Sequence, residues 1–517
     1  MKKRLIAFWP LGLLLLATFI TRIVKLEDLF YFTYDESVFA FVGRRMALWH
    51  HIPLIGGATP LGVHVAPYFY WFFALTLIVG KLNPLFWGYI AAALAVATTF
   101  MMYKVGILID SKKVGITAAI LWAFSYMANV YDRHFWGLTF GPLFSLLVIY
   151  SLYKIKRGNQ KFIYVLGLIL AFVIHADLSY YVFLVLAVVA WIIFKLPLNK
   201  KTLVALAIIL SSFIPLVIFD LRHNFANTKP VLEFIQAGRN NPGFESQKFI
   251  DNSLLFPRTL TRLVYTFGDN QIAKQYSYCV SYVLEKFRAI PWYLVVLSSV
   301  ILIAFVIKHL RGSPVNSARV GFRLIALLLV LYFFGIQLYG TIFRADIFEH
   351  YITGILAAFL LILAKVVSYL PKNLWLVFLA IFVTVNLYKL LNTQNSQGLE
   401  TKRLAIEYTM QQVGGKPFSL DSLSTCWKYN GYRYLFTVFG REPVKSYVDP
   451  SFAYLYGTTP VAEKHPATVV AFVVHDFAPE TEEFYRRYAL LKSHEIKSTI
   501  FGVVEVIIMD NSTGWFD

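Results

Sequence analysis

Long runs of apolar residues dominate the chain up to about residue 391 and then stop. A helix of about 20 residues crosses the hydrocarbon layer of a bilayer, and most of these runs approach or exceed that length. The pattern therefore predicts a mostly α-helical, polytopic membrane bundle of about eleven spans. We place the spans at about 5–24, 85–108, 114–131, 138–153, 162–175, 179–195, 202–220, 291–307, 324–340, 351–370 and 374–391.

Two apolar stretches are short for a crossing. Residues 67–80 are rich in aromatic side chains, and counting them as a span would invert the sidedness of every later loop. We therefore expect them to form a helix lying in the outer interface, where aromatic residues gather. Residues 162–175 are expected to form one arm of a tight helical hairpin that is broken at His175-Ala176-Asp177.

The charges in the short loops assign the two membrane faces. Loops rich in Lys and Arg stay in the cytoplasm. Alternate loops carry fifteen of these residues and only one acid, Asp110, so we expect them and the N-terminus to be cytoplasmic, in a multi-pass plasma-membrane protein. The basic residues are Lys2, Lys3, Arg4, Lys112, Lys113, Lys154, Lys156, Arg157, Lys161, Lys200, Lys201, Lys308, Arg311, Arg319 and Lys372.

The last part of the chain, 392–517, has a different pattern. The stretch Thr468–His475 predicts a buried strand, and Glu482–Leu491 predicts a helix. From Ser396 onward, 12 Lys and Arg balance 14 Asp and Glu, so this part is nearly neutral. We expect a small, soluble α/β domain on the extracytoplasmic side, following a transmembrane domain at 1–391.

Composition narrows the class further. The chain is 58% hydrophobic, 17% aromatic and 15% charged, whereas soluble domains carry about 25% charged residues. The net charge of +19 is spread over short loops between spans, which argues against nucleic-acid binding. The basic start is expected to be an uncleaved first span rather than a signal peptide. Cys279 and Cys426 lie far apart and form neither a disulfide framework nor a metal motif.

Candidate chemistry begins in the first outer loop with Tyr34-Asp35-Glu36, about ten residues beyond the first span. The following segment, Ser37–Trp49, is apolar on one face and carries Arg44-Arg45 on the other. Two interpretations are open. Asp35 could be the N-cap of this helix, with Glu36 favouring the positive helix end. Alternatively, the acidic pair could be catalytic.

An ordered set of motifs resembles the GT-C superfamily of glycosyltransferases. The similarity is greatest to the branch of protein O-mannosyltransferases and aminoarabinose–lipid A transferases, including bacterial members that use polyprenyl-phosphate sugars, and it covers about 1–391. One departure is that no acid lies near Gly137-Leu138-Thr139, where some members carry a second one. The motifs are Tyr34-Asp35-Glu36, Pro67-Tyr68-Phe69-Tyr70-Trp71, Lys112-Lys113-Val114-Gly115, Tyr131-Asp132-Arg133-His134-Phe135-Trp136, Phe219–Thr228 and Phe348-Glu349-His350-Tyr351.

The resemblance implies that Asp35 is the essential acid of the first outer loop, with Glu36 beside it. A sugar on polyprenyl phosphate has a phosphate leaving group, so its acceptor hydroxyl or amine is the group that must lose a proton. One carboxylate suits that task as a general base. The base half of inverting glycoside hydrolysis uses the same logic, so inversion is expected.

The donor phosphate requires cations on the same face, and the planar fork of Arg matches phosphate oxygens. The alternative for each Arg is an interfacial position with its head among lipid headgroups, and for each His or Asp a structural cap or turn. We expect no metal or other cofactor, since Asp35-Glu36 lacks an Asp-X-Asp spacing. Arg222 is the preferred phosphate ligand, because Asp220, Arg222 and His223 cluster where a span meets the long outer region. The phosphate-binding candidates are Arg222, Arg133, Arg344, His350 and Tyr351, and further site candidates are His64, Asp132, His175, Asp177 and His223.

The sequence thus predicts a membrane glycosyltransferase that moves a hexosyl or pentosyl group from a polyprenyl-phosphate donor to an extracytoplasmic protein, lipid or glycan. A transporter or flippase for lipid-linked glycans is the main alternative. Transporters show repeated halves and spans broken near the midplane, whereas the ionisable residues here gather at span edges. A non-catalytic scaffold would need no acidic pair facing several arginines.

Overall fold

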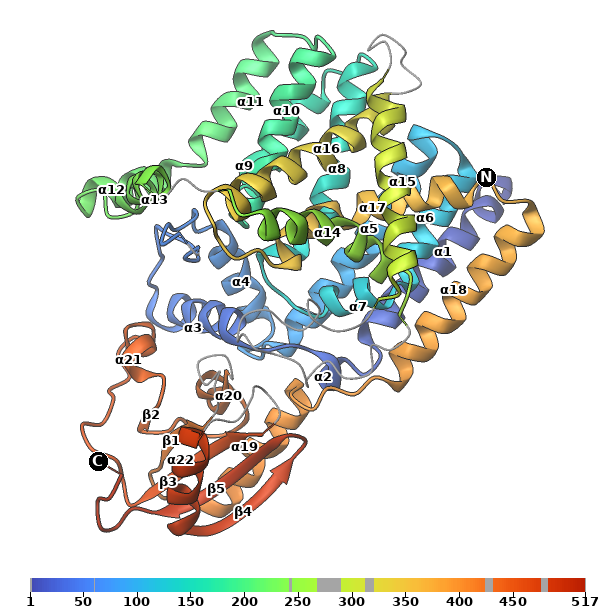
Figure 1. The fold of residues 1–517 in the computed structure, drawn as a ribbon. Helices are drawn as coiled ribbons and strands as arrows, with labels where there is room; N and C mark the ends of the chain where they lie inside the picture. Colours follow the sequence, from blue (N-terminus) through green and yellow to red (C-terminus); the bar gives the residue numbers. More distant parts are fainter. Residues whose placement is uncertain are drawn as a thin grey trace.

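The computed structural model describes residues 2–59, 61–240, 244–266, 290–311, 320–423, 431–475 and 482–516. Both cysteines and Arg319 lie outside these residues. A bundle of helices forms the larger part, and a five-stranded sheet with its helices lies at one end of it (Figure 1). Within the described residues, all strands fall between Ser419 and Asp510, in the stretch predicted to form the α/β domain.

The bundle begins with twelve short and long helical elements. The four-residue α2 and the amphipathic α3 follow the first helix, and single turns of 3-10 helix precede α8 and α10. Their bounds are α1 (Lys2–Ile23), α2 (Leu26–Leu29), α3 (Tyr34–Trp49), α4 (Tyr68–Val79), α5 (Leu85–Ile109), α6 (Lys112–Phe124), α7 (Tyr126–Asp132), η1 (Gly137–Phe140), α8 (Gly141–Lys156), α9 (Phe162–Val173), η2 (Leu178–Tyr180) and α10 (Tyr181–Ile193).

The second half of the bundle contains two amphipathic helices, α13 and α14, between apolar ones. A π-helical turn, η4, extends α16, and a 3-10 helix, η5, leads into α17. Their bounds are α11 (Lys200–Ser211), α12 (Ile214–Arg222), α13 (Lys229–Asn240), α14 (Ser246–Arg262), α15 (Trp292–Leu310), α16 (Val320–Ile336), η4 (Gln337–Ile342), η5 (Glu349–Ile355), α17 (Leu356–Val367) and α18 (Lys372–Asn392).

The apolar helices coincide with the predicted spans. Seven continuous helices in the described residues are long and apolar enough to cross a membrane, and α6 with α7 makes an eighth that is bent by 62°. Together with three shorter apolar helices, Pro10–Ile23, Phe162–Val173 and Leu178–Ile193, they account for the eleven predicted spans. The predicted uninterrupted span at 114–131 is wrong in one detail. Ser125 leaves the helical conformation, and its hydroxyl accepts from the Ala128 N–H at 3.4 Å, which starts a new helix in a new direction.

Burial separates the inner helices of the bundle from the outer ones. The α8 and α17 spans are each 78% buried, whereas the α11–α12 and α15 spans are each 17% buried. A helix that is apolar all round and still exposed in the folded chain must face lipid. The inner helices therefore form the protein core, and the outer ones form the boundary with the bilayer.

The Lys-rich turns meet at one end of the bundle. The Lys113 ammonium donates to the carbonyls of Ser368 and Leu370, each at 2.8 Å, and Lys156 donates to the carbonyl of Phe194 at 2.9 Å. The predicted break is confirmed, since α9 ends at Val173 and η2 begins at Leu178. The predicted tight hairpin is wrong, because α9 packs against α8 and α11 rather than against α10. The broken turn lies at the other end from these lysines, as the sequence predicts.

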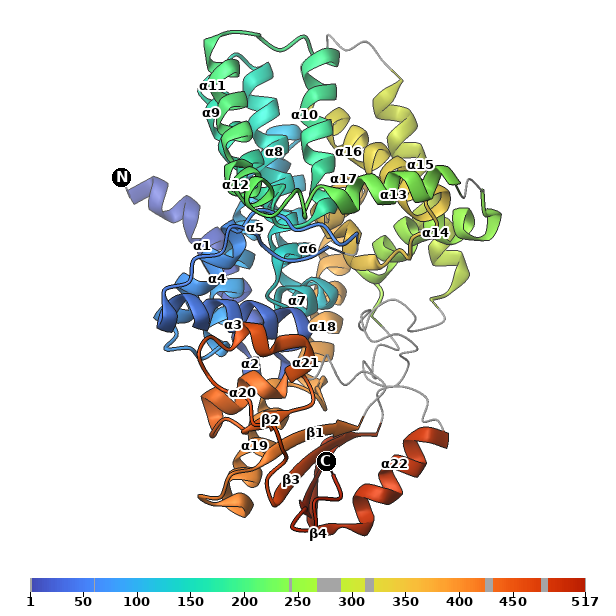
Figure 2. The ribbon, with the colours of Figure 1, turned by 90° about the vertical axis from the view of Figure 1, so that its left-hand side faces the viewer.

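The helix α4 lies against α3 rather than standing alone. Its 12 residues rise about 18 Å, which is too short for the ~30 Å hydrocarbon layer. Gly43 of α3 makes the close approach possible, because a Cβ there would lie 3.2 Å from the Cα of Ala74. The two helices therefore form one aromatic-rich layer at the end of the bundle that lies against the soluble domain (Figure 2).

The sheet of the soluble domain is mixed, with strand order β2-β1-β3-β5-β4. Strand β1 pairs in parallel with β2 and β3, while β5 pairs antiparallel with β3 and β4. The predicted strand and helix at 468–475 and 482–491 are confirmed as β3 and α22. The bounds are α19 (Leu399–Val413), β1 (Ser419–Leu423), α20 (Tyr432–Phe439), β2 (Lys445–Ser446), α21 (Asp449–Phe452), η7 (Ala453–Leu455), β3 (Thr468–Val474), α22 (Glu482–Ser493), β4 (Glu495–Phe501) and β5 (Val504–Asp510).

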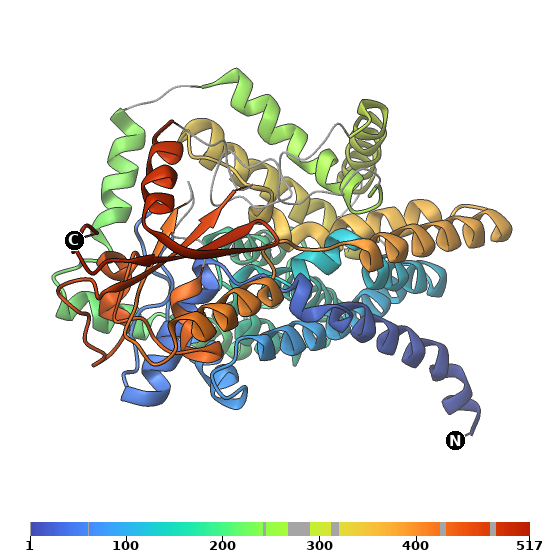
Figure 3. The ribbon, with the colours of Figure 1, turned by 90° about the horizontal axis from the view of Figure 1, so that it is seen from below.

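Alternate residues of β3 face two different apolar clusters. Val469, Ala471 and Val473 pack with α22, whereas Val470 and Phe472 face α19 and α20 (Figure 3). This follows from the two-residue period of a strand. The second cluster does not end at the domain boundary, because it continues into Phe30, Phe32 and Phe41 of the membrane part. The soluble domain therefore shares its core with the first outer loop.

Candidate active site

The N-terminus of α3 is held by Glu36 rather than by Asp35. The Glu36 carboxylate accepts hydrogen bonds from the Thr33 N–H at 3.1 Å and the Thr33 hydroxyl at 2.8 Å, which makes a capping box. The interpretation of Asp35 as the N-cap is wrong, because Thr33 occupies that position. Asp35 lies in the first turn of the helix, and its carboxylate takes no part in the capping box.

Glu36 also forms an ion pair with the Nδ1 of His134, from the loop after α7. Its side chain is fully buried. Burial by itself raises the pKa of this carboxyl, but the pairing with His134 and the hydrogen bonds from Thr33 outweigh burial and hold the pKa below its ordinary value. Glu36 is therefore a fixed anion that ties two outer loops together.

Asp35 differs from its neighbour in environment. It is half-buried, and within the described part of the chain its carboxylate accepts no hydrogen bond. Burial, reinforced by the negative charges of Glu36 and Asp177, raises the pKa of Asp35 to about 7, although His134 opposes the shift. A carboxylate with this pKa is partly protonated near neutral pH, so it can both accept and release a proton there.

His134 lies in an aromatic stack that joins three segments. Its ring is stacked on Trp136 at 4.0 Å and on Tyr31 at 5.5 Å, and Trp136 in turn contacts His350 at 5.0 Å. The backbone N–H of Tyr31 donates to the carbonyl of Arg133 at 3.2 Å. The stack therefore brings the predicted site residue His350 into the same aromatic group as His134, the partner of Glu36.

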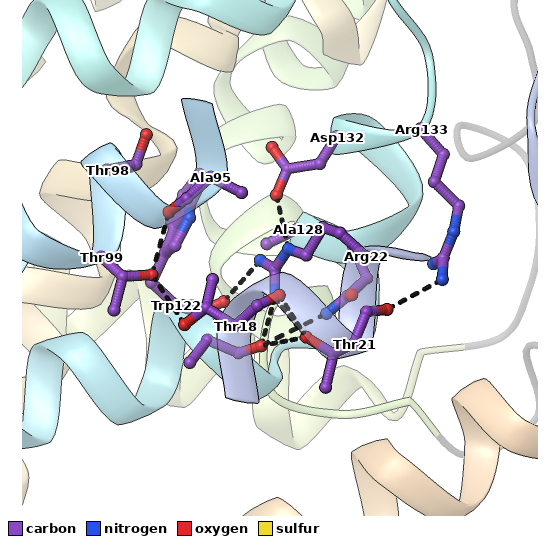
Figure 4. A network of polar contacts seen from close by, with 12 residues as sticks. Thr18, Thr21, Arg22, Ala95, Thr98, Thr99, Trp122, Ala128, Asp132 and Arg133 are labelled. Atoms are coloured by element: carbon purple, nitrogen blue, oxygen red, sulfur yellow. Dashed lines mark hydrogen bonds and ion pairs between the residues drawn. The ribbon is translucent and has the colours of Figure 1, made fainter. Parts of the chain in front are cut away.

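Two arginines, Arg22 and Arg133, form polar contacts near the last turn of α1 (Figure 4). Arg22 forms a buried ion pair with Asp132 at 2.9 Å. Asp132, a predicted site residue, is thereby committed to holding α1 against α7. Arg133 donates through Nη2 to the carbonyls of Thr21 at 2.8 Å and Val24 at 2.9 Å. Its Nε and Nη1 are buried and have no hydrogen-bond partner among the described residues.

A second buried ion pair, which the sequence did not predict, lies beside His350. Arg262 of α14 donates to Glu349 at 2.7 Å, and the hydroxyl of Thr259 donates to the other carboxylate oxygen at 2.7 Å. The signal for Glu349 was its place in the Phe348-Glu349-His350-Tyr351 motif. Nothing in the sequence around Arg262 distinguishes it from the other basic residues of the long outer region.

A cavity of about 220 Å³ lies near the acidic pair, and Asp177 is part of its wall. Tyr351, a predicted site residue, also lines it. Asp177 caps the short η2 helix by accepting from the Ser179 N–H at 2.8 Å. Burial raises the pKa of Asp177. Since the charge of Asp177 raises the pKa of Asp35, the two carboxylates lie within electrostatic reach of each other.

Two predicted histidines fix the loops of this region. His64 accepts at its backbone carbonyl from Asn227 at 3.0 Å, and its ring Nδ1 contacts the carbonyl of Gly56 at 2.9 Å. His175 is buried, with its Nε2 at 2.8 Å from the hydroxyl of Ser212. The contacts of His64 connect its loop to Asn227 and Gly56, and the contact of His175 connects the turn after α9 to Ser212.

The remaining predicted residues lie on the surface. Arg222 and Arg344 are exposed, and His223 is exposed while stacked on Phe219 at 4.2 Å. The structure does not bring these three side chains into the group around Asp35 and His134. A phosphate-binding role for Arg222 or Arg344 stays a prediction.

The soluble domain contributes a lysine that the sequence did not single out. Lys402 of α19 is buried, and its ammonium donates to the carbonyl of Phe32 at 2.6 Å. Burial lowers the pKa of Lys402 to about 7, although Glu36 opposes the shift. Nearby, Arg403 pairs with Glu27 at 2.6 Å. The soluble domain thus binds the first outer loop, which carries the acidic pair, through a hydrogen bond and an ion pair.

No three His, Cys, Asp or Glu side chains cluster in a metal-binding arrangement within the residues that the structure describes. The prediction that no metal is needed remains a prediction.

A helical bundle with apolar, span-length helices and a small α/β domain at one end is an arrangement also found among solved structures. ArnT from Cupriavidus metallidurans, crystallised with undecaprenyl phosphate, is 12% identical with a TM-score of 0.51, and the match covers 97% of this chain and 98% of that one. An oligosaccharyltransferase from Archaeoglobus fulgidus is 10% identical with a TM-score of 0.47, covering 89% and 67%. No protein-family model matches the sequence, and neither does any curated protein.

Proposed function

We propose that the chain is a glycosyltransferase that moves a sugar from a polyprenyl-phosphate donor to an extracytoplasmic acceptor, with inversion at the anomeric carbon. The observation that carries this proposal is the Asp35 carboxylate, whose pKa is about 7, beside the fixed Glu36–His134 pair. The GT-C fold supports it, and ArnT, which shares that fold, was crystallised with undecaprenyl phosphate.

In the proposed reaction the acceptor hydroxyl or amine attacks the anomeric carbon as the bond from that carbon to the phosphate oxygen breaks. Asp35 takes the acceptor proton, and polyprenyl phosphate leaves as an anion. Glu36 acts as a positioning residue, since it is buried and already bonded to Thr33 and His134. Arg133 is the favoured donor-phosphate ligand, because two of its nitrogens are buried without partners in the described part of the chain.

The proposed location is the plasma membrane, with the N-terminus in the cytoplasm and the soluble domain outside. The Lys-rich turns meet at one end of the bundle, and the acidic pair with the soluble domain lies at the other. Basic loops are retained in the cytoplasm, so the site faces the extracytoplasmic side, where lipid-linked donors present their sugars.

The test incubates the purified full chain with a panel of polyprenyl-phosphate sugars and follows loss of sugar from each. We expect one donor to be consumed, and Asp35→Asn to lower kcat by about 10²- to 10⁴-fold. Asp251→Asn is the matched control, because Asp251 is an exposed acid of α14 outside the site, and it should keep the wild-type rate. If no donor is consumed while proteoliposomes carry the intact lipid across the bilayer, the transporter alternative is correct.

A further inference from the structure

The 220 Å³ cavity that Asp177 lines has both polar and apolar residues in its wall. Its polar members are one carboxylate, from Asp177, and the hydroxyls of serine, threonine and tyrosine residues. Its apolar members are aliphatic side chains and tyrosine ring faces. None of the described residues that line it is a Lys, Arg or His. The lining residues used below are Thr59, Asp177, Ser179, Tyr332, Tyr339 and Tyr351.

Three hydroxyls of this wall lack hydrogen-bond partners among the described residues, namely those of Thr59, Ser179 and Tyr332. The Tyr332 side chain is only 1% exposed. A buried hydroxyl without a partner destabilises the protein, and three of them around one cavity favour a ligand that supplies both hydrogen-bond donors and acceptors.

The charge of the wall limits which ligand fits. A phosphate or another anion in the cavity would be repelled by the Asp177 carboxylate, with no cation among the described lining residues to balance it. The volume is below the ~300 Å³ at which sites for drug-sized ligands begin. A single small ring with several hydroxyls and an apolar face matches the size, the hydroxyls and the tyrosine rings.

We propose that this cavity is a subsite for one sugar ring that carries no negative charge. The inference deepens the proposed function and rests on it. Asp177 accepts hydrogen bonds from ring hydroxyls or from a ring amine, and the three hydroxyls complete the polar contacts. Uronic acids are excluded from this position, and the donor phosphate binds outside the cavity.

The wall is held rigidly enough to select a ring. Thr59 lies in a loop closed by the bonds from Gly56 N to Val65 O at 2.6 Å and from Thr59 N to Val63 O at 2.8 Å. Asn227 holds the same loop through His64, whose backbone N–H donates to it at 2.6 Å. On the opposite side, Tyr339 and Tyr351 lie edge to face at 6.4 Å. Binding therefore needs little reordering of the protein.

The experiment measures binding directly, by saturation-transfer NMR on the full chain in detergent. The probes are the methyl glycosides of glucose, mannose, galactose and arabinose, with methyl glucuronide and methyl galacturonide as their anionic counterparts. We expect saturation transfer to at least one neutral glycoside and about tenfold less to its uronate. No signal from any neutral glycoside, or an equal signal from a uronate, overturns the proposal.

Two tyrosine variants form a matched pair. Tyr332→Phe removes a hydroxyl that has no described partner, so it should weaken glycoside binding about five- to tenfold and leave thermal stability unchanged or higher. Tyr180→Phe removes a hydroxyl that donates to the Leu138 carbonyl at 2.7 Å, so it should lower stability and leave binding unchanged. Equal glycoside binding by Tyr332→Phe and wild type would contradict the subsite.

Turnover then separates this inference from the proposed function. Glycoside binding without consumption of any polyprenyl donor means that the function fails and the subsite stands. Donor consumption with the KM values unaffected by Tyr332→Phe means that the function stands and the subsite fails. A raised KM for the donor assigns the cavity to the transferred sugar, and a raised KM for the acceptor assigns it to an acceptor ring.

Discussion

Asp35 is expected to set the acidic limb of the pH–rate profile. Burial and the neighbouring charges of Glu36 and Asp177 raise the pKa of Asp35 to about 7. A general base acts only when ionised. With this pKa the ionised fraction of Asp35 is about 9% at pH 6 and about 91% at pH 8, so kcat/KM should rise about tenfold over that interval. A solvent-exposed aspartate would be fully ionised throughout and would give a flat profile.

The assay is the initial rate of donor consumption by the purified chain, with the donor below its KM, measured between about pH 5 and pH 9. The donor is a phosphodiester and does not titrate in this range, so the pH dependence of the rate arises from groups of the protein. Asp177→Asn gives an internal control. Since the charge of Asp177 raises the pKa of Asp35, removing that charge should move the limb to lower pH.

The same pKa shift predicts the effect of Asp35 on stability. The folded state binds the Asp35 proton more tightly than the unfolded state, because the pKa is raised on folding. Ionising this carboxyl therefore destabilises the fold as pH rises from about 4 to about 7. Asp35→Asn should be as heat-resistant as wild type at pH 8, or more so, while losing activity. A flat rate profile between pH 6 and pH 8 in the wild type, or an Asp35→Asn variant that unfolds early, would refute the reasoning.

Three further outcomes are expected. Glu36→Gln should lower both activity and thermal stability, since it breaks the ion pair with His134, and losing one partner of a buried pair costs about 3–5 kcal/mol; an unchanged melting profile would contradict this. Arg133→Gln should raise the donor KM about tenfold, whereas the exposed Arg222→Gln should not; equal effects in donor kinetics would reject Arg133 as the preferred ligand. Lys402→Met should lower kcat and shift the pH–rate profile, because it removes the hydrogen bond to the Phe32 carbonyl. Lys402→Arg should restore part of the rate. A wild-type pH–rate profile for the Met variant would show that Lys402 has no role at the site.

The lysine prediction reflects how the soluble domain is attached. Lys402 donates to the Phe32 carbonyl, Arg44 pairs with Glu442, and Tyr434 donates to the Leu82 carbonyl at 2.9 Å. Gly398 lies so close to Asp28 that a Cβ there would be 1.7 Å from its carbonyl oxygen. The loop that carries the acidic pair is thus enclosed between two parts of the chain, so changes at the domain boundary should reach the site.

The sequence by itself determined the membrane bundle, its spans and the domain that follows. Lipid imposes a simple rule, a run of about 20 apolar residues for each crossing, and that rule acts on consecutive residues. The break at 175–177 and the strand β3 were predicted from the local pattern of polar and apolar residues. The pair Asp35-Glu36 could also be picked out, because its charge interrupts an apolar pattern near the end of a span.

Only the tertiary structure decided what each of these charges does. Asp35 and Glu36 are adjacent in the sequence, yet one is a fixed anion paired with His134 and the other has a pKa near 7. His134 lies almost a hundred residues away, and Lys402 lies further still. Arg222 was preferred over Arg133 in sequence, but it is exposed. Burial and charge proximity depend on which distant segments pack together, and these set the pKa and the pairing of every group at the site.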